Sequence, residues 1–377
     1  MSDASVSGSP AGTARWGRAF RFRAGRDGLD APPSAIYRWD LDKTYLRSDF
    51  ESLRKMVRVP FERAEDKVDE PGVVALIRAL KASAREEGRT ALVHFITASP
   101  PQIGRAIREK LALDGVDVDD IVFKDQLHHL VRGHFRYLRE QVGFKLAELL
   151  KARLAAPAGS IEFLFGDDWE SDPLIYSLYA DLVAGRLEQE SLGDALVRLR
   201  IDPARLVEIK TLSARIRPHD PVRRIFINLE RRTPPGRFRA FGSRLVPTFN
   251  YFQTALMLYH DGMLPLAYVA AVGRSLIDCS AYTREQLRNS LDDLSRRGYL
   301  PPPEPDLRLD LEEIGVLPAD GAAARWSRRF WRRLRHGRYR RHRRRASGPP
   351  PAHGRIDYPR LVDAWITHGG GGPGGGG

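Results

Sequence analysis

ALVHFIT, residues 91–97, is a nearly continuous apolar run, which is typical of a strand buried on both faces. Further extended runs are expected at 34–39, 121–123, 161–165 (IEFLF) and 222–228 (VRRIFIN). Segments with helical spacing of apolar residues lie between these runs, at 70–87, 101–113, 135–154 and 173–184. Strands that alternate with helices indicate βαβ units, so we predict an α/β fold with a parallel sheet flanked by helices.

The rest of the chain divides by composition. Residues 1–33 are rich in Ser, Gly, Ala and Arg without periodicity, and we expect a disordered leader before the α/β domain at 34–232. The region 233–302 is mainly helical in pattern, most clearly at 282–299, and is predicted to be a helical extension. Residues 303–377 are expected to hold a proline-flanked linker, an arginine-rich tail and a glycine-rich end.

Charge, hydrophobicity and cysteine content bear on the cellular location of the protein. The net charge is +13, but residues 325–345 contain twelve arginines and no acidic residue, so the remainder is close to neutral. No apolar stretch approaches the ~18 residues of a membrane span, and the first residues lack the apolar core of a secretory signal. Cys279 is the only cysteine, which excludes an internal disulfide framework. We therefore expect a cytoplasmic protein.

The first candidate chemical element follows the strand at 34–39 and reads DLDKT, residues 40–44. In extended chain alternate residues point the same way, so Asp40 and Asp42 share a face. Two crowded carboxylates repel each other unless a proton or a cation lies between them. Mg²⁺ bound by their oxygens would serve as that cation and would leave one carboxylate oxygen available to attack phosphorus. The alternative is an ordinary acidic turn after a strand.

The second element is GDDWESDP, residues 166–173, directly after a buried strand. Its four carboxylates within six residues call for a compensating cation, which Gly166 would allow the backbone to approach closely. The alternative is a solvated helix start, since acidic residues and Pro173 both suit the first helical turn.

Two single residues complete the set. Thr97 ends the apolar run at 91–97, where its hydroxyl could donate to a phosphate oxygen. Lys145 lies in a largely apolar helix start and could neutralise a phosphoryl group and a nucleophile. Taken singly, Thr97 could equally be a helix cap and Lys145 a solvated side chain.

The order of these elements resembles the four-motif pattern of phosphatases of the haloacid dehalogenase (HAD) superfamily. More narrowly, WDLDKT, FITASP, Lys145 and GDDWESDPLIY look like the catalytic domain of the actin-patch-associated phosphatidate phosphatases and their uncharacterised bacterial relatives. The resemblance spans residues 35–185. Lys43, Thr97 and the GDDW segment depart from that pattern, where an acidic residue, a serine and GDSG are commoner, but no required functional group is lost.

This resemblance implies a HAD-like, Rossmann-type domain and a Mg²⁺-dependent phosphomonoesterase that works through an aspartyl-phosphate. Asp40 would be the nucleophile. Asp42 would protonate the leaving alcohol and then activate water, while Thr97 and Lys145 would hold the phosphoryl oxygens.

The resemblance also implies the metal ligands and the substrate class. Asp167, with Asp172 close by, would complete a Mg²⁺ site together with Asp40 and the carbonyl of Asp42. Little room remains for a cap domain, because only 46–67 precedes the helix that the sheet needs. HAD enzymes with little cap tend to act on bulky, polymeric or membrane-borne substrates, and a lipid phosphate such as phosphatidate is the leading class. The alternatives are a polynucleotide or phosphoprotein phosphatase, and a non-catalytic module that binds lipid or nucleic acid.

The arginine-rich tail suggests a partner. Trp326, Phe330, Trp331 and Leu334 fall on one helical face with arginines elsewhere, a pattern that suits an anionic membrane surface and a peripheral membrane address. The same charge suits nucleic-acid phosphates, and a tail without a specific partner is the third interpretation.

Overall fold

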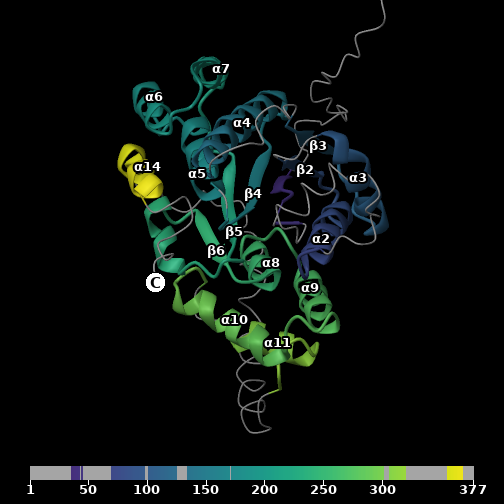
Figure 1. Cartoon of the computed structure of the whole chain (residues 1–377). Helices are drawn as coiled ribbons and strands as arrows, with labels where there is room; N and C mark the ends of the chain where they lie inside the picture. The colour runs from purple at the N-terminus through teal and green to yellow at the C-terminus, as the bar shows by residue number, and fades with distance from the viewer. Residues whose placement is uncertain are drawn as a thin grey trace, which may run out of the picture.

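A computed structural model describes residues 35–42, 44–45, 69–97, 101–124, 134–169, 171–300, 305–319 and 355–367. Its centre is a six-stranded, all-parallel sheet in the order β3-β2-β1-β4-β5-β6 (Figure 1). The strands are β1 Ala35–Asp40, β2 Ala91–Thr97, β3 Asp120–Phe123, β4 Ile161–Asp167, β5 Val222–Asn228 and β6 Leu245–Thr248. The predicted α/β fold with a parallel sheet flanked by helices is confirmed, and the strand order is Rossmann-like.

Helices cover both faces of the sheet (Figure 1). One apolar core lies between the sheet and α2 Val73–Glu86, α3 Gly104–Leu113, α8 Tyr251–His260, α9 Leu266–Asp278, α10 Arg284–Arg296 and α11 Pro305–Glu313. The other lies between the sheet and α4 His134–Ala155, α5 Asp172–Val183, α6 Gln189–Arg198, α7 Pro203–Ala214, η3 Pro235–Phe241 and α14 Tyr358–Thr367. Because strand residues alternate, Tyr37 and Trp39 enter the first core, and Arg38 and Asp40 face α4.

The strand order reverses between β1 and β4. The chain builds outward from β1 to β3 and then returns to place β4 on the other side of β1. In open parallel sheets a crevice forms at such a switch point, outside the carboxyl ends of the strands. Asp40 ends β1 and Asp167 ends β4, so both lie at this switch point. On the opposite face the rings of Trp39 and Phe165 stack 3.8 Å apart and hold the two strands together.

The region 233–302 differs from its helical prediction, because it also supplies β6 to the sheet. β6 has four residues and contains Pro247, which an edge strand tolerates, and so short a segment gives little periodic signal. The linker expected after 303 contains α11, whose Leu309 and Leu311 are buried. Lys145 lies in the interior of α4 and not at a helix start.

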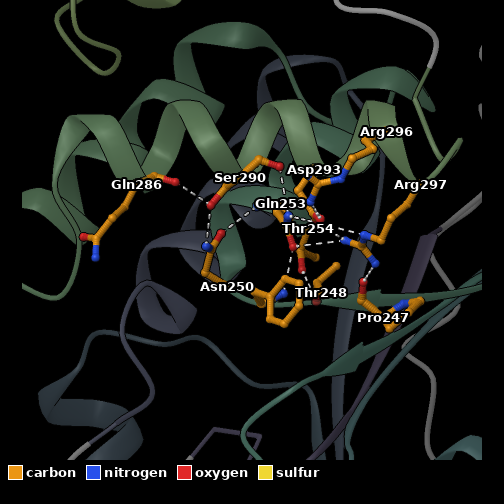
Figure 2. A network of polar contacts seen from close by, with 11 residues as sticks. Pro247, Thr248, Asn250, Gln253, Thr254, Gln286, Ser290, Asp293, Arg296 and Arg297 are labelled. Atoms are coloured by element: carbon orange, nitrogen blue, oxygen red, sulfur yellow. Dashed lines mark hydrogen bonds and ion pairs between the residues drawn. The ribbon is translucent and has the colours of Figure 1, made fainter. Parts of the chain in front are cut away.

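A buried polar network ties α10 to the β6–α8 junction (Figure 2). Gln253 Nε2 donates to Ser290 O (2.9 Å) and to an oxygen of Asp293 (3.0 Å), while its Oε1 accepts from Phe249 N (2.7 Å). Arg297 donates to Pro247 O at 2.7 Å. A buried amide whose oxygen and nitrogen both have partners fixes geometry, so this network holds the sheet edge.

The C-terminal segment returns to the α/β domain. Tyr358 of α14 is buried and donates to Asp181 Oδ2 at 2.8 Å, and Arg198 pairs with Asp363 at 2.6 Å. The arginine-rich segment at 325–345 is therefore flanked by α11 and α14, both of which pack on the domain. The predictions for this segment, for the leader 1–33, for the cap at 46–67 and for the glycine-rich end concern residues outside the described part of the chain. Within the described residues, no helix has the length and apolarity needed to cross a membrane.

Candidate active site

Six side chains chosen from the sequence lie together at the switch point between β1 and β4. All are buried, and they come from β1, the turn after it, β2, α4, β4 and the start of α5. They are Asp40, Asp42, Thr97, Lys145, Asp167 and Asp172. The carboxyl ends of parallel strands share one edge, which is why residues far apart in the sequence meet here.

Lys145 joins two of the carboxylates. Its Nζ lies 2.8 Å from Asp40 Oδ1 and 2.7 Å from Asp172 Oδ1. The ammonium is almost fully buried, and an unpaired charge there would be costly. Because Lys145 lies on the face of α4 that packs against the sheet, the helix delivers this charge directly to the carboxyl end of β1.

Three carboxylates form a group that could hold a metal ion. One oxygen from each of Asp40, Asp167 and Asp172 lies within 4.8 Å of the others. Asp167 is oriented by the main-chain nitrogen of Trp169, which donates to Oδ1 at 2.6 Å, and by Thr44, whose hydroxyl donates to Oδ2 at 3.4 Å. Three clustered carboxylates favour a cation, and an all-oxygen donor set suits a hard divalent ion such as Mg²⁺.

Asp42 occupies a different position. Its Oδ2 accepts a hydrogen bond from the hydroxyl of Thr97 at 2.7 Å, across the ends of the neighbouring strands β1 and β2. Its carboxylate is therefore directed toward β2, while the metal-competent group contains Asp40, Asp167 and Asp172. The predicted metal contact of Asp42 is through its carbonyl and remains a prediction.

Gly166 has a structural reason to lack a side chain. A Cβ at this position would lie 2.4 Å from Asp172 Oδ2 and 2.6 Å from Asp172 Cβ. The sequence suggested that this glycine lets the backbone approach a cation, whereas the structure shows that it makes room for the Asp172 carboxylate. The start of α5 can therefore press against β4 and bring Asp172 beside Asp40.

Asp168 has a separate role from its neighbour. Its two oxygens accept hydrogen bonds from the main-chain nitrogens of Arg231 (2.9 Å) and Thr233 (3.0 Å). It thereby fixes the segment that follows β5. Of the acidic residues at 167–172, Asp167 and Asp172 face the metal-competent group, Asp168 holds a loop, and Glu170 lies outside the described residues.

Two tyrosines support the site, and neither was assigned a role from the sequence, although Tyr176 ends the GDDWESDPLIY segment. Tyr251 of α8 donates to the carbonyl of Thr44 at 2.5 Å and so fixes the turn after β1. Tyr176 donates to the carbonyl of Phe165 at 3.2 Å, and burial, reinforced by Asp172, raises its pKa far above the ordinary value. Thr44 was visible as the last residue of the DLDKT motif, but a tyrosine 207 positions further along has no such signal.

Comparisons with models of known protein families, with curated proteins and with solved structures find no match to this chain. The class of protein is thus defined by fold and site alone. It is an α/β protein with a Rossmann-like parallel sheet and a buried acidic centre at the switch point between β1 and β4.

Proposed function

We propose that this protein is a phosphomonoesterase that requires a divalent cation, with Mg²⁺ as the expected ion, and that Asp40 forms an aspartyl-phosphate. The observation that carries the proposal is the meeting of Asp40, Asp167 and Asp172 at the switch point, with Lys145 on two of them. This arrangement agrees with the HAD-like domain that the sequence resembles.

Asp40, Asp167 and Asp172 would hold the cation, together with the carbonyl of Asp42. When bound, the ion would neutralise charge on the phosphoryl oxygens and orient the phosphate. Three protein carboxylates leave coordination positions for water and substrate oxygens, as Mg²⁺ sites in phosphoryl-transfer enzymes usually do.

In the first step, a carboxylate oxygen of Asp40 attacks phosphorus and the bond from phosphorus to the leaving oxygen breaks. Protonated Asp42 gives its proton to that oxygen, so an alcohol departs. In the second step, Asp42 takes a proton from water while the water oxygen attacks phosphorus, and the bond from phosphorus to Asp40 breaks. One water is consumed, and one alcohol and one inorganic phosphate are released.

Thr97 and Lys145 have distinct roles in these steps. The Thr97 hydroxyl holds the Asp42 carboxyl at 2.7 Å, which orients the group that moves the proton. Lys145 stays beside Asp40 and balances the charge that the transferred phosphoryl group brings. Holding both groups before substrate arrives lowers the entropic cost of the reaction.

The leading substrate class remains a lipid phosphate such as phosphatidate, with polynucleotide and phosphoprotein phosphatases as alternatives on the same core. A non-catalytic binding module is less well supported. A cluster of buried carboxylates is costly to a fold and is more readily explained by a bound cation than by a binding surface for lipid or nucleic acid.

The test is a phosphate-release screen against phosphatidate, 5′-phosphorylated oligonucleotides, nucleotides and phosphopeptides, each with Mg²⁺ and with EDTA. We expect release from at least one class in Mg²⁺ and none in EDTA. An Asp40→Asn sample purified in parallel controls for contaminating phosphatase. Absence of release from every class, with each divalent metal tried, would contradict the proposal.

An experiment on the partner of the arginine-rich segment requires a variant that keeps α14. Tyr358 is buried against Asp181, and truncation of the chain would expose that surface. Replacing the twelve arginines at 325–345 by glutamine leaves α14 in place. Weaker co-sedimentation with anionic vesicles is expected, at about 1 kcal/mol per basic residue before screening. Unchanged vesicle binding with a lost nucleic-acid gel shift would favour the polynucleotide alternative.

A further inference from the structure

The segment that follows β5, residues 229–241, places positive charge beside the acidic centre. Four of its residues are exposed arginines, and its only acidic residue is Glu230; the arginines are Arg231, Arg232, Arg237 and Arg239. Asp168 accepts hydrogen bonds from the main chain of this segment and is the direct neighbour of Asp167. The basic segment is therefore attached to the carboxyl end of β4, where the metal-competent group lies.

Arg231 is held over an aromatic platform. Its guanidinium carbon lies 4.4 Å from the ring centroid of Trp169, close enough for a cation–π contact. The main-chain nitrogen of Trp169 donates to Asp167 Oδ1, and Trp169 is 38% exposed. The aromatic platform therefore lies at the border between the site and solvent. Stacking leaves the edge of the guanidinium, with its N–H donors, available for a ligand.

Another arginine that stacks on aromatic rings differs in its ion pairing. Arg297 lies over Phe249 and Tyr299, but it also pairs with Asp293 at 2.6 Å and donates to the carbonyl of Pro247. These polar contacts of Arg297 belong to the network that fixes α10 (Figure 2). Among the described residues, the guanidinium of Arg231 has no carboxylate partner. An exposed, pre-oriented arginine without an internal anion is suited to an external one.

We propose that Arg231, positioned by Trp169, binds a second anionic group of the substrate, next to the phosphate that is hydrolysed. This inference rests on the proposed phosphatase function and adds a substrate class to it: phosphomonoesters that present a second phosphate beside the scissile one. The clustered carboxylates of Asp40, Asp167 and Asp172 would repel such a group, and an arginine at the border offsets that repulsion. The second phosphate can belong to the same molecule or to a neighbouring lipid headgroup.

The test compares propane-1,3-diol bisphosphate with propyl phosphate in the wild type and in Arg231→Gln. The measured quantity is the ratio of kcat/KM values for the two esters, which cancels effects on shared chemistry. We expect the wild type to prefer the bisphosphate and Arg231→Gln to lower that ratio about tenfold or more. Trp169→Ala should lower it in part, and Trp169→Phe should restore it, because phenylalanine keeps a ring face.

A vesicle arm identifies the source of the second anion. Phosphatidate hydrolysis is compared in neutral phosphatidylcholine vesicles and in vesicles that also contain phosphatidylserine. A rise with the anionic lipid that Arg231→Gln removes assigns the group to neighbouring headgroups. An Arg231-dependent preference for the soluble bisphosphate without such a rise assigns it to the substrate molecule itself.

Arg274→Gln is the matched control, since it removes one exposed arginine on α9, an element that contributes no residue to the site. Turnover of both esters with a ratio unchanged by Arg231→Gln would overturn this inference and leave the phosphatase proposal standing. If no ester is hydrolysed, calorimetric binding of propane-1,3-diyl bisphosphonate and propyl phosphonate decides. Weaker bisphosphonate binding by Arg231→Gln would keep the anion site while the phosphatase proposal fails, and equal binding would reject both.

Discussion

Two clusters of buried charge lie on the α4 side of the sheet, and the same elements build both. The acidic centre takes Asp40 from β1, Lys145 from α4 and Asp167 from β4. The second cluster, the arginine–glutamate network, takes Arg38 from β1, Arg153 from α4 and Glu162 from β4, and adds Tyr179 and His94. Arg38 precedes Asp40 by two residues, so both side chains point to the same face.

The clusters differ in how their charges are compensated. Both oxygens of Glu162 are fully used: Oε1 accepts from Arg38 and Arg153, and Oε2 from Arg38 and Tyr179, at 2.7–3.1 Å. In the acidic centre, oxygens of Asp40, Asp167 and Asp172 instead lie within 4.8 Å of one another, and Lys145 pairs with Asp40 and Asp172. Breaking a buried pair that the protein satisfies internally is costly, whereas a buried cluster of like charges is suited to a bound cation.

Asp40→Asn should have the largest effect on activity. We expect the rate of phosphate release to fall about 10⁴-fold or more, because an amide cannot form the acyl-phosphate. The free energy of unfolding without metal should not fall, since one of several like charges is removed. Steady-state kinetics and urea unfolding measure the two quantities, and the exposed Asp117→Asn, before β3, is the control. Substantial turnover by Asp40→Asn would reject the nucleophile.

The opposite result is expected for Glu162→Gln. Removing the carboxylate leaves Arg38 and Arg153 buried with reduced compensation, and the free energy of unfolding should fall by about 3 to 5 kcal/mol. Activity per folded molecule should change much less than in Asp40→Asn. Glu87→Gln, which removes a surface pair with Arg89, is the control and should cost less than about 1 kcal/mol. Equal losses of unfolding free energy in Glu162→Gln and Glu87→Gln would show that the arginine–glutamate network contributes no more to stability than a surface pair.

Metal dependence separates two adjacent aspartates. Asp167→Ala should lower activity about 100-fold or raise the Mg²⁺ concentration needed for half-maximal turnover, because one carboxylate of the metal-competent group is lost. In Asp168→Asn the Mg²⁺ requirement should be unchanged, since Asp168 binds main-chain nitrogens. Mg²⁺ titrations after EDTA treatment measure both. Full turnover in chelator would remove the metal from the proposal.

The strands of the sheet could be predicted from the sequence more completely than the contacts within the site. β2 matched its prediction residue by residue, because an apolar run between turn signals has few other interpretations. Asp40, Thr97 and Asp167 could be expected to lie close together because the carboxyl ends of parallel strands meet at one edge, whereas Lys145 and Asp172 were expected in the site from the family resemblance. The Lys145 bridge, the hydrogen bonds of Asp168 and the Tyr251 contact join segments that are distant in sequence, and no local pattern encodes them. β6 was missed because four residues containing a proline give no period.

The smallest expected effect concerns the pH dependence of stability and His94. Burial and the adjacent Arg38 lower the pKa of His94 to about 3, and Arg38 lies 3.3 Å from its Nδ1. The His94 ring binds a proton near pH 6.5 in the unfolded chain but only near pH 3 in the folded protein. The free energy of unfolding therefore decreases as the pH is lowered from about 6.5 to about 3. Burial opposes ionisation of Glu162, but Arg38 and Arg153 lower its pKa to about 2, which adds a further loss from about pH 4.5 downward.

His94→Gln removes the first of these two contributions and leaves the second. Between pH 6 and 4 the wild type should lose up to about 3 kcal/mol more unfolding free energy than the variant, which is one proton over two pH units. Urea unfolding at a series of pH values measures the slopes, and comparing slopes cancels any uniform cost of the substitution. Parallel slopes would mean that His94 is protonated in the folded protein near its ordinary pKa. The network would then tolerate an extra positive charge, and the contrast with the acidic centre would rest on Glu162 alone.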